Sequence, residues 1–98
     1  MAKSKHDQIA EGLAKKFGTE YKEHKGIDIV TKDRVIEVEV TKNGIYQGID
    51  QVKRSSKARY IAVDDSNLQN ALQITKGTGI GVMDSKGEII KKAARKKR

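Results

Sequence analysis

The sequence contains no cysteine, no proline and no tryptophan, and it has one phenylalanine among its 98 residues. The absence of cysteine excludes a disulfide framework, a thiolate zinc site and a cysteine nucleophile. Only 36% of the residues are hydrophobic, so the core must be small and mostly aliphatic. This length and composition predict one domain without a large buried cofactor pocket.

Long hydrophobic runs are missing as well. No apolar segment approaches the ~20 residues that a membrane span requires, and residues 1–8 lack the apolar region of a secretory signal. We therefore expect no membrane segment. A reducing cytoplasm is the default location for a chain without cysteine.

Positive charge is in excess, with 21 Lys and Arg against 13 Asp and Glu. Most of the excess lies near the end of the chain, so we divide it into a domain over residues 1–90 and a basic tail over residues 91–98. A block of like charges stays solvated until a polyanion arrives, and cations that neutralise phosphates release counterions. The tail therefore predicts contact with nucleic acid, and a purely solubilising tail is the alternative. Its cations are Lys91, Lys92, Arg95, Lys96, Lys97 and Arg98.

Hydrophobic spacing predicts the fold. Apolar residues recur at helical spacing over residues 4–17, and Gly18 suits the position after a helix end. Two more helices are expected, one over residues 44–57 and one that follows the capping residues Asp64 and Asp65. Strands are expected over residues 19–24, 26–30, 35–41, 60–63, 80–83 and 88–90. The order α-β-β-β-α-β-α-β-β predicts an α/β fold with a single mixed central sheet and flanking helices.

The strand over residues 35–40 is the most informative segment. Side chains of a strand alternate between its faces, so its even-numbered aliphatic residues point toward a helix layer. Glu37 and Glu39 point the other way, with ~7 Å between their Cα atoms. Asp28 on the preceding strand joins the two glutamates if the apolar residues of both strands share the core face.

Three clustered carboxylates disfavour one another's charge unless a cation intervenes. Mg²⁺ and Mn²⁺ prefer oxygen ligands, and such an ion can activate water and stabilise the charge that develops on a phosphodiester. The cluster therefore predicts a site for Mg²⁺ or Mn²⁺. The alternative is an ordinary solvent-exposed sheet face, on which polar residues alternate with apolar ones.

The sequence Gly-Ile-Asp-Ile-Val at residues 26–30, followed by a turn and Ile-Glu-Val-Glu-Val at residues 36–40, resembles the PD-(D/E)XK nuclease superfamily. This superfamily includes restriction endonucleases, archaeal Holliday junction resolvases and RecB-like nucleases. The resemblance covers roughly residues 5–90 and implies a restriction endonuclease-like fold. It also implies a Mg²⁺-dependent endonuclease that hydrolyses phosphodiester bonds in DNA, with branched or junction DNA as a candidate substrate. Asp28 and Glu37 would bind the metal, and Gln51 and Glu11 would be further catalytic residues.

One position departs from the family pattern, because Glu39 stands where the family has a lysine. Glu39 could act as a base or as a further metal ligand. Lys42 or Lys53 could supply the missing charge, and both are also candidates for contact with nucleic acid. Alternatively the site is inactive, and the protein is a nucleic-acid-binding module with the same fold.

Two further expectations concern His6 and an edge of the sheet. His6 is expected to be a polar residue at a helix start, with no nearby carboxylate partner at metal-ligand spacing. An exposed apolar edge near Ile80 and Ile89 predicts a homodimer, whose two-fold symmetry would suit a symmetric DNA substrate.

Overall fold

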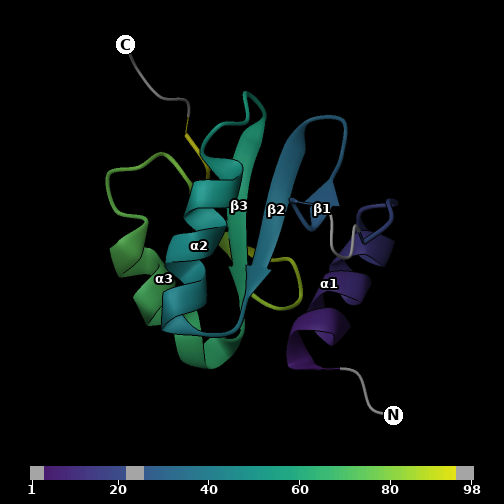
Figure 1. Ribbon diagram of the computed structural model, residues 1–98, viewed down its shortest axis with the longest axis horizontal. Coiled ribbons are helices and arrows are strands. Elements are labelled where there is room, and N and C mark those ends of the chain that lie inside the picture. The colour runs from purple at the N-terminus through teal and green to yellow at the C-terminus, as the bar shows by residue number, and fades with distance from the viewer. Residues whose placement is uncertain (1–3, 22–25, 95–98) are drawn as a thin grey trace.

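Five strands form one mixed sheet in the order β1-β2-β3-β4-β5 (Figure 1). The structure is a computed structural model that describes residues 4–21 and 26–94. Strand β2 pairs antiparallel with β1 and parallel with β3, whereas β4 pairs parallel with β3 and antiparallel with β5. The prediction of a single mixed sheet is therefore confirmed. The strands are β1 (Ile29–Val30), β2 (Arg34–Glu39), β3 (Ala58–Val63), β4 (Gly81–Met83) and β5 (Ile89–Lys91).

Helices cover both faces of the sheet. Helix α1 (Lys5–Lys16) lies on one face, and helices α2 (Lys42–Val52) and α3 (Leu68–Ile74) lie on the other (Figure 1). A short 3₁₀ turn, η1 (Asp65–Asn67), leads into α3. Both longer helices begin at a hydroxyl cap, because Ser4 Oγ accepts from an N–H of α1 and Thr41 Oγ1 accepts from one of α2. None of the helices within the described residues is long and apolar enough to cross a membrane.

The alternation of side chains along β2 divides the core in two. Ile36 and Val38 pack on the α1 side with Leu13, while Val35 packs on the α2 side with Ile45. Both halves of the core are almost entirely aliphatic, as the composition predicts. Glu37 and Glu39 share the face of Val35 by the period of two, so they lie on the side of the sheet that α2 covers.

Most element boundaries differ from the predictions by one or more residues; β1, for example, begins at Ile29 rather than at residue 26. The strand expected over residues 19–24 is not formed in its described part, residues 19–21, and the remainder lies outside the described residues. The reason is local: the Thr19 N–H donates to Ala14 O and completes the end of α1, with Gly18 at φ 68°. Helix α2 starts at Lys42 rather than at residue 44, because the Thr41 hydroxyl caps it there, and it ends at Val52 rather than at residue 57.

The C-terminal strand changes the interpretation of the tail. Lys91 is the last residue of β5, and its Nζ donates to Thr75 O at 2.8 Å. Burial lowers the pKa of this lysine, so Lys91 belongs to the sheet rather than to a solvated tail. Lys92 is exposed. The other predicted cations, Arg95, Lys96, Lys97 and Arg98, lie outside the described residues.

The exposed apolar edge of the sheet includes Ile89 but not Ile80, the other residue predicted for it. Ile80 is 1% exposed and belongs to the core on the α2 side, so its assignment to an exposed edge is wrong. Ile89 and its neighbour Ile90 are 46% and 45% exposed on β5. The edge is therefore made by β5 alone among the described strands.

Candidate functional site

The pairing of β1 with β2 brings Asp28 next to Glu37. Ile29 pairs with Ile36 in the antiparallel register, so the residues one step further face each other across the ribbon. The Asp28 N–H donates to Glu37 Oε1 at 2.9 Å, and the Val38 N–H donates to Asp28 Oδ2 at 2.9 Å. Both carboxylates are thereby fixed by the backbone of the neighbouring strand.

Helix α2 makes room for the glutamates through two glycines. A Cβ on Gly44 would collide with Glu39 Oε1, and a Cβ on Gly48 would lie 3.0 Å from Glu39 Cγ and 3.1 Å from Glu37 Cγ. The two glycines stand four residues apart and therefore share one face of the helix. The glutamate side chains occupy the space that larger residues of α2 would fill.

The acidic face is consequently covered rather than open. Asp28 and Glu37 are each 7% exposed, and Glu39 is half-buried. This burial overturns the alternative of an ordinary solvent-exposed sheet face. The three carboxylates, Asp28, Glu37 and Glu39, are called the acidic cluster below.

Burial and mutual repulsion both act against ionisation of the acidic cluster. Burial raises the pKa of Glu37 to about 8, and the charges of Asp28 and Glu39 add to the effect. Burial, and then the charge of Asp28, raises the pKa of Glu39 to about 7. Burial also raises the pKa of Asp28. The cluster therefore resists full negative charge near neutral pH.

His6 joins the acidic cluster from α1, although the sequence predicted no nearby carboxylate partner at metal-ligand spacing. Its Nε2 lies 3.1 Å from Asp28 Oδ2, and its Nδ1 lies 3.3 Å from Asp7 Oδ1. The Tyr21 hydroxyl donates to Asp7 Oδ1 at 2.9 Å and lies 3.3 Å from His6 Nδ1. The imidazole is thus held between two carboxylates, and it fixes one oxygen of Asp28.

Sequence reasoning missed His6 because its partner lies 22 positions away in the chain. A signal was present in the helical spacing. Position 6 precedes Ile9 and Ala10 by three and four residues, so it extends the buried stripe of α1. A histidine at the end of a buried stripe is directed toward the sheet.

The other predicted site residues on helices lie around the acidic cluster or away from it. Gln51 is exposed on α2, three positions after Gly48, so it borders the face that covers the glutamates. Glu11 is exposed on α1 and lines a pocket with Lys15 and Tyr21, whereas the contact from α1 to Asp28 comes from His6.

The two candidate lysines lie at opposite ends of α2. Lys42 is the first residue of the helix, close in the chain to Glu39, and it is exposed. Lys53 follows the last residue, ~16 Å along the helix axis, and its Nζ lies 3.0 Å from Asp50 Oδ1. Lys42 is therefore the lysine of the two that can supply positive charge near the acidic cluster.

The donor types of the acidic cluster fit a hard divalent cation, which takes carboxylate oxygens as ligands. Glu39 accepts no hydrogen bond from any described residue. Within residues 4–21 and 26–94, however, no group of three or more Asp, Glu or His side chains is positioned as a ready-made metal site. The chemistry of the ligands is suitable, and their arrangement is not preformed.

Comparison of the chain with protein-family models, with curated proteins and with solved structures gave no match. The restriction endonuclease-like assignment therefore stays a prediction.

Proposed function

We propose that this protein is a divalent-metal-dependent DNA endonuclease with a restriction endonuclease-like fold. The observation that carries the proposal is the acidic cluster, in which Asp28, Glu37 and Glu39 are buried together and disfavour one another's charge. Natural proteins rarely bury several carboxylates without a cationic partner. A bound divalent ion would relieve this repulsion.

Asp28 and Glu37 would hold Mg²⁺ or Mn²⁺ in this proposal. The bound ion would supply Lewis-acid stabilisation of a phosphodiester and an activated water. Glu39 would accept a proton from that water or complete the set of ligands. His6 would position Asp28 through the contact at 3.1 Å, as residues behind metal ligands commonly do.

Cleavage assays test the proposal directly. Full-length protein would be incubated with supercoiled, linear duplex, single-stranded and four-way-junction DNA, in Mg²⁺, Mn²⁺ or EDTA. We expect cleavage that requires the metal and that falls by about 100-fold or more in Asp28→Asn and Glu37→Gln. These substitutions keep the size of the side chain and the acceptor oxygen.

The matched control is Glu88→Gln, which removes one negative charge from a side chain that is 70% exposed and remote in sequence from the acidic cluster. Its rate should equal that of the parent protein. Cleavage that persists unchanged in Asp28→Asn, with a normal circular dichroism spectrum, would rule out this site assignment.

A nucleic-acid-binding module without catalysis is the second candidate. It is favoured by the glutamate at position 39 and by the hydrogen bond that already engages Glu37 Oε1. Binding of DNA without cleavage in either metal would establish this alternative.

In this proposal the protein acts on symmetric DNA as a homodimer, because a two-fold dimer matches a two-fold substrate. Its basis is the exposed pair Ile89 and Ile90 on the edge strand β5. An edge strand carries unpaired backbone N–H and C=O groups that a second copy can pair.

A further inference from the structure

A basic groove lies at the end of the sheet where the parallel strands β2 and β3 begin. It has a volume of about 790 Å³ and is lined by the loop between α2 and β3 and by the C-terminal segment at Ala93 and Ala94. Figure 1 shows this end of the sheet at the top, where α2 leads into β3. The lining cations are Lys53, Lys57 and Arg59, and the hydroxyl residues Ser55 and Ser56 stand between them.

Two of the three cations of this basic groove, Lys57 and Arg59, are held by neutral acceptors. Lys57 Nζ donates to the carbonyl oxygen of Thr31 at 2.7 Å, which ties the groove to the turn between β1 and β2. Arg59 Nη1 donates to the carbonyl oxygen of Lys53 at 3.2 Å. Backbone carbonyls position these side chains without cancelling their charge. In the described part of the chain, neither Lys57 nor Arg59 forms an ion pair with a carboxylate.

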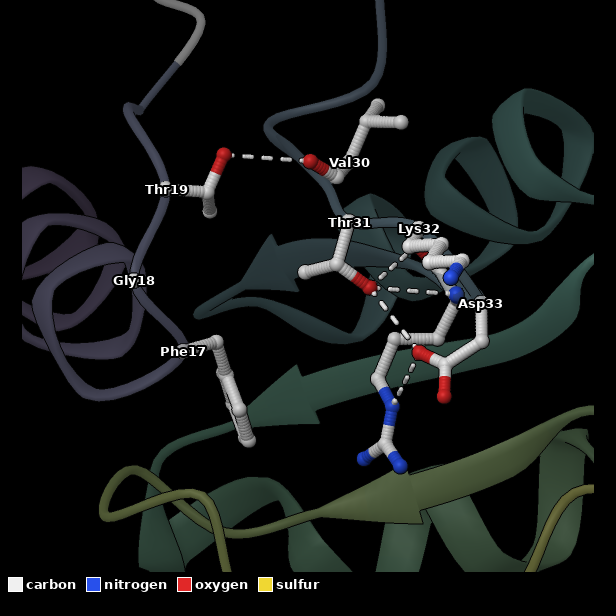
Figure 2. Close-up of a pocket in the computed structure, with 8 residues that line it drawn as sticks. Phe17, Gly18, Thr19, Val30, Thr31, Lys32 and Asp33 are labelled. Atoms are coloured by element: carbon white, nitrogen blue, oxygen red, sulfur yellow. Dashed lines mark hydrogen bonds and ion pairs between the residues drawn. The ribbon is translucent and has the colours of Figure 1, made fainter.

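A second hollow continues the basic surface on the other side of Asp33. It has a volume of about 530 Å³ and lies between the end of α1 and the turn before β2, as Figure 2 shows with Phe17 and Thr19 opposite Thr31 and Lys32. Arg34 lines it, with its guanidinium carbon 5.5 Å from the ring centres of both Phe17 and Tyr60. The aromatic rings hold the guanidinium in place, and its Nε also lies 3.6 Å from Oδ1 of the exposed Asp33.

The balance of charge over the two hollows is strongly positive. Residues 32–34 and 50–59 contain six cations and two carboxylates. Asp50 pairs with Lys53, and Asp33, which lines both hollows, pairs with Arg34. Both carboxylates are exposed, and ion pairs at exposed positions are weak. The chain also continues from Ala94, in the wall of the groove, directly into the sequence Arg-Lys-Lys-Arg.

The acidic cluster does not oppose an anion at this end of the sheet. From Arg34 the strand β2 advances ~10 Å to Glu37 and ~17 Å to Glu39, at ~3.4 Å per residue. The raised pKa values of Glu37 and Glu39 also reduce the negative charge of the acidic cluster near neutral pH. The molecule thus presents a basic end and an acidic end.

We infer that the basic groove, with Lys53, Lys57 and Arg59 as its cations, binds the phosphate backbone of a nucleic acid without reading its sequence. Several separate cations around one hollow of about 790 Å³ match a polymer of phosphates better than one small anion. Serine hydroxyls and cations are the groups that contact phosphate oxygens in such interfaces. The inference concerns binding alone and does not depend on cleavage at the acidic cluster.

Fluorescence anisotropy with a labelled duplex and a labelled single strand, in EDTA and from about 50 to 300 mM salt, tests the inference. In the double variant Lys57→Gln, Arg59→Gln we expect the affinity to fall by about 10-fold or more, and the slope of log K against log salt to shrink by about 1.8 for two lost phosphate contacts on a duplex. The charge-conserving variant Lys57→Arg, Arg59→Lys should restore most of the affinity. It also controls for loss of folding.

Two control variants remove charge elsewhere. Lys15→Gln, Lys86→Gln also loses two positive charges, at exposed positions on α1 and in the turn after β4, and its affinity should change by less than about 2-fold. A variant with glutamine at positions 95–98 measures the contribution of the last four residues.

Equal losses in the groove variant and in the Lys15 and Lys86 variant would overturn the inference. So would an undiminished affinity of the groove variant while the variant at positions 95–98 no longer binds. Binding of poly-glutamate as tight as that of DNA would assign the groove to acidic proteins instead. Because EDTA prevents metal-dependent cleavage, failure of the proposed nuclease activity would leave this result intact, and the reverse also holds.

Discussion

Carboxylates in this protein occupy two opposite environments. Asp64 is buried, yet hydrogen bonds from Ser66, Asn67 and Lys5 lower its pKa to about 2 against the effect of burial. The acidic cluster has far fewer donors, and Glu37 receives its one described hydrogen bond from the Asp28 N–H. The fold supplies donors to one buried acid and few to the group of three, and this contrast makes the acidic cluster the candidate functional site.

The raised pKa values predict how stability depends on pH. Between about pH 4.5 and 8 the folded state retains protons on Glu37 and Glu39 that the unfolded chain releases. The free energy of unfolding must therefore fall as pH rises through this window, and the stabilisation is complete only below it. We expect a loss on the order of a few kcal/mol between about pH 5 and pH 8.5. Urea denaturation in EDTA at several pH values measures it.

Glu37→Gln cannot ionise but can still accept from the Asp28 N–H. Its stability should fall less steeply with pH, and above about pH 8 it should be more stable than the parent. Glu88→Gln is the exposed control and should follow the parent curve. If the free energy of unfolding of the parent protein is constant over this range, the carboxyl groups of Glu37 and Glu39 are not buried as the structure has them.

At the scale of elements, glycines determine how closely segments approach. In β4, a Cβ on Gly81 would collide with Tyr60 Cε1 and would lie 2.6 Å from both Ala93 N and Lys91 O. Two of these three atoms belong to the backbone of the C-terminal segment, which cannot move aside without breaking its pairing with β4. The absence of a side chain at Gly81 therefore lets the C-terminal segment, which forms one wall of the basic groove, pack closely against β4.

Gly81→Ala should lower the free energy of unfolding by about 2 kcal/mol or more, because overpacking against backbone forces the strands apart. Gly12→Ala is the matched control. It places the same methyl group on α1, where nothing lies within 4 Å of the new Cβ, and it should raise stability by about 0.5–1 kcal/mol. Chemical denaturation of both variants checks the pair. Equal stability of the two would show that the C-terminal segment is not packed against β4.

At the scale of the whole molecule, the sheet has one edge with exposed aliphatic side chains. Strand β5 carries Ile89 and Ile90, whereas Val30 in the opposite edge strand β1 is half-buried. Pairing of two β5 strands would satisfy the backbone groups of the edge and cover part of both isoleucines, which point to opposite faces of the sheet. Because the same patch meets itself, the assembly would close as a two-fold dimer.

Sedimentation equilibrium tests this assembly. We expect the parent protein to be dimeric at tens of micromolar, and Ile89→Lys, Ile90→Lys to be monomeric, since two lysines at the edge oppose pairing. Tyr46→Lys is the control, because Tyr46 is 53% exposed but lies on α2. A parent protein that stays monomeric at every concentration would exclude the dimer.

The sequence by itself determined the features that depend on neighbours in the chain. Ser4 and Thr41 cap helices through hydroxyls three residues from their targets. The alternation along β2 placed Glu37 and Glu39 on one face, and pairing across a short turn placed Asp28 beside them. These features follow from periods of 3.6 and 2 residues and from the geometry of a hairpin. They could therefore be predicted without knowledge of the rest of the fold.

Only the tertiary structure decided what surrounds those carboxylates. That α2 lies over them, with Gly44 and Gly48 against Glu39, depends on which helix packs on which face of the sheet. The approach of His6 to Asp28 and the tie from Lys57 to Thr31 join residues 22 and 26 positions apart. Periodicity orients a side chain within its own element but does not choose its partner. Packing of the whole chain makes that choice, because it alone determines which apolar surfaces meet.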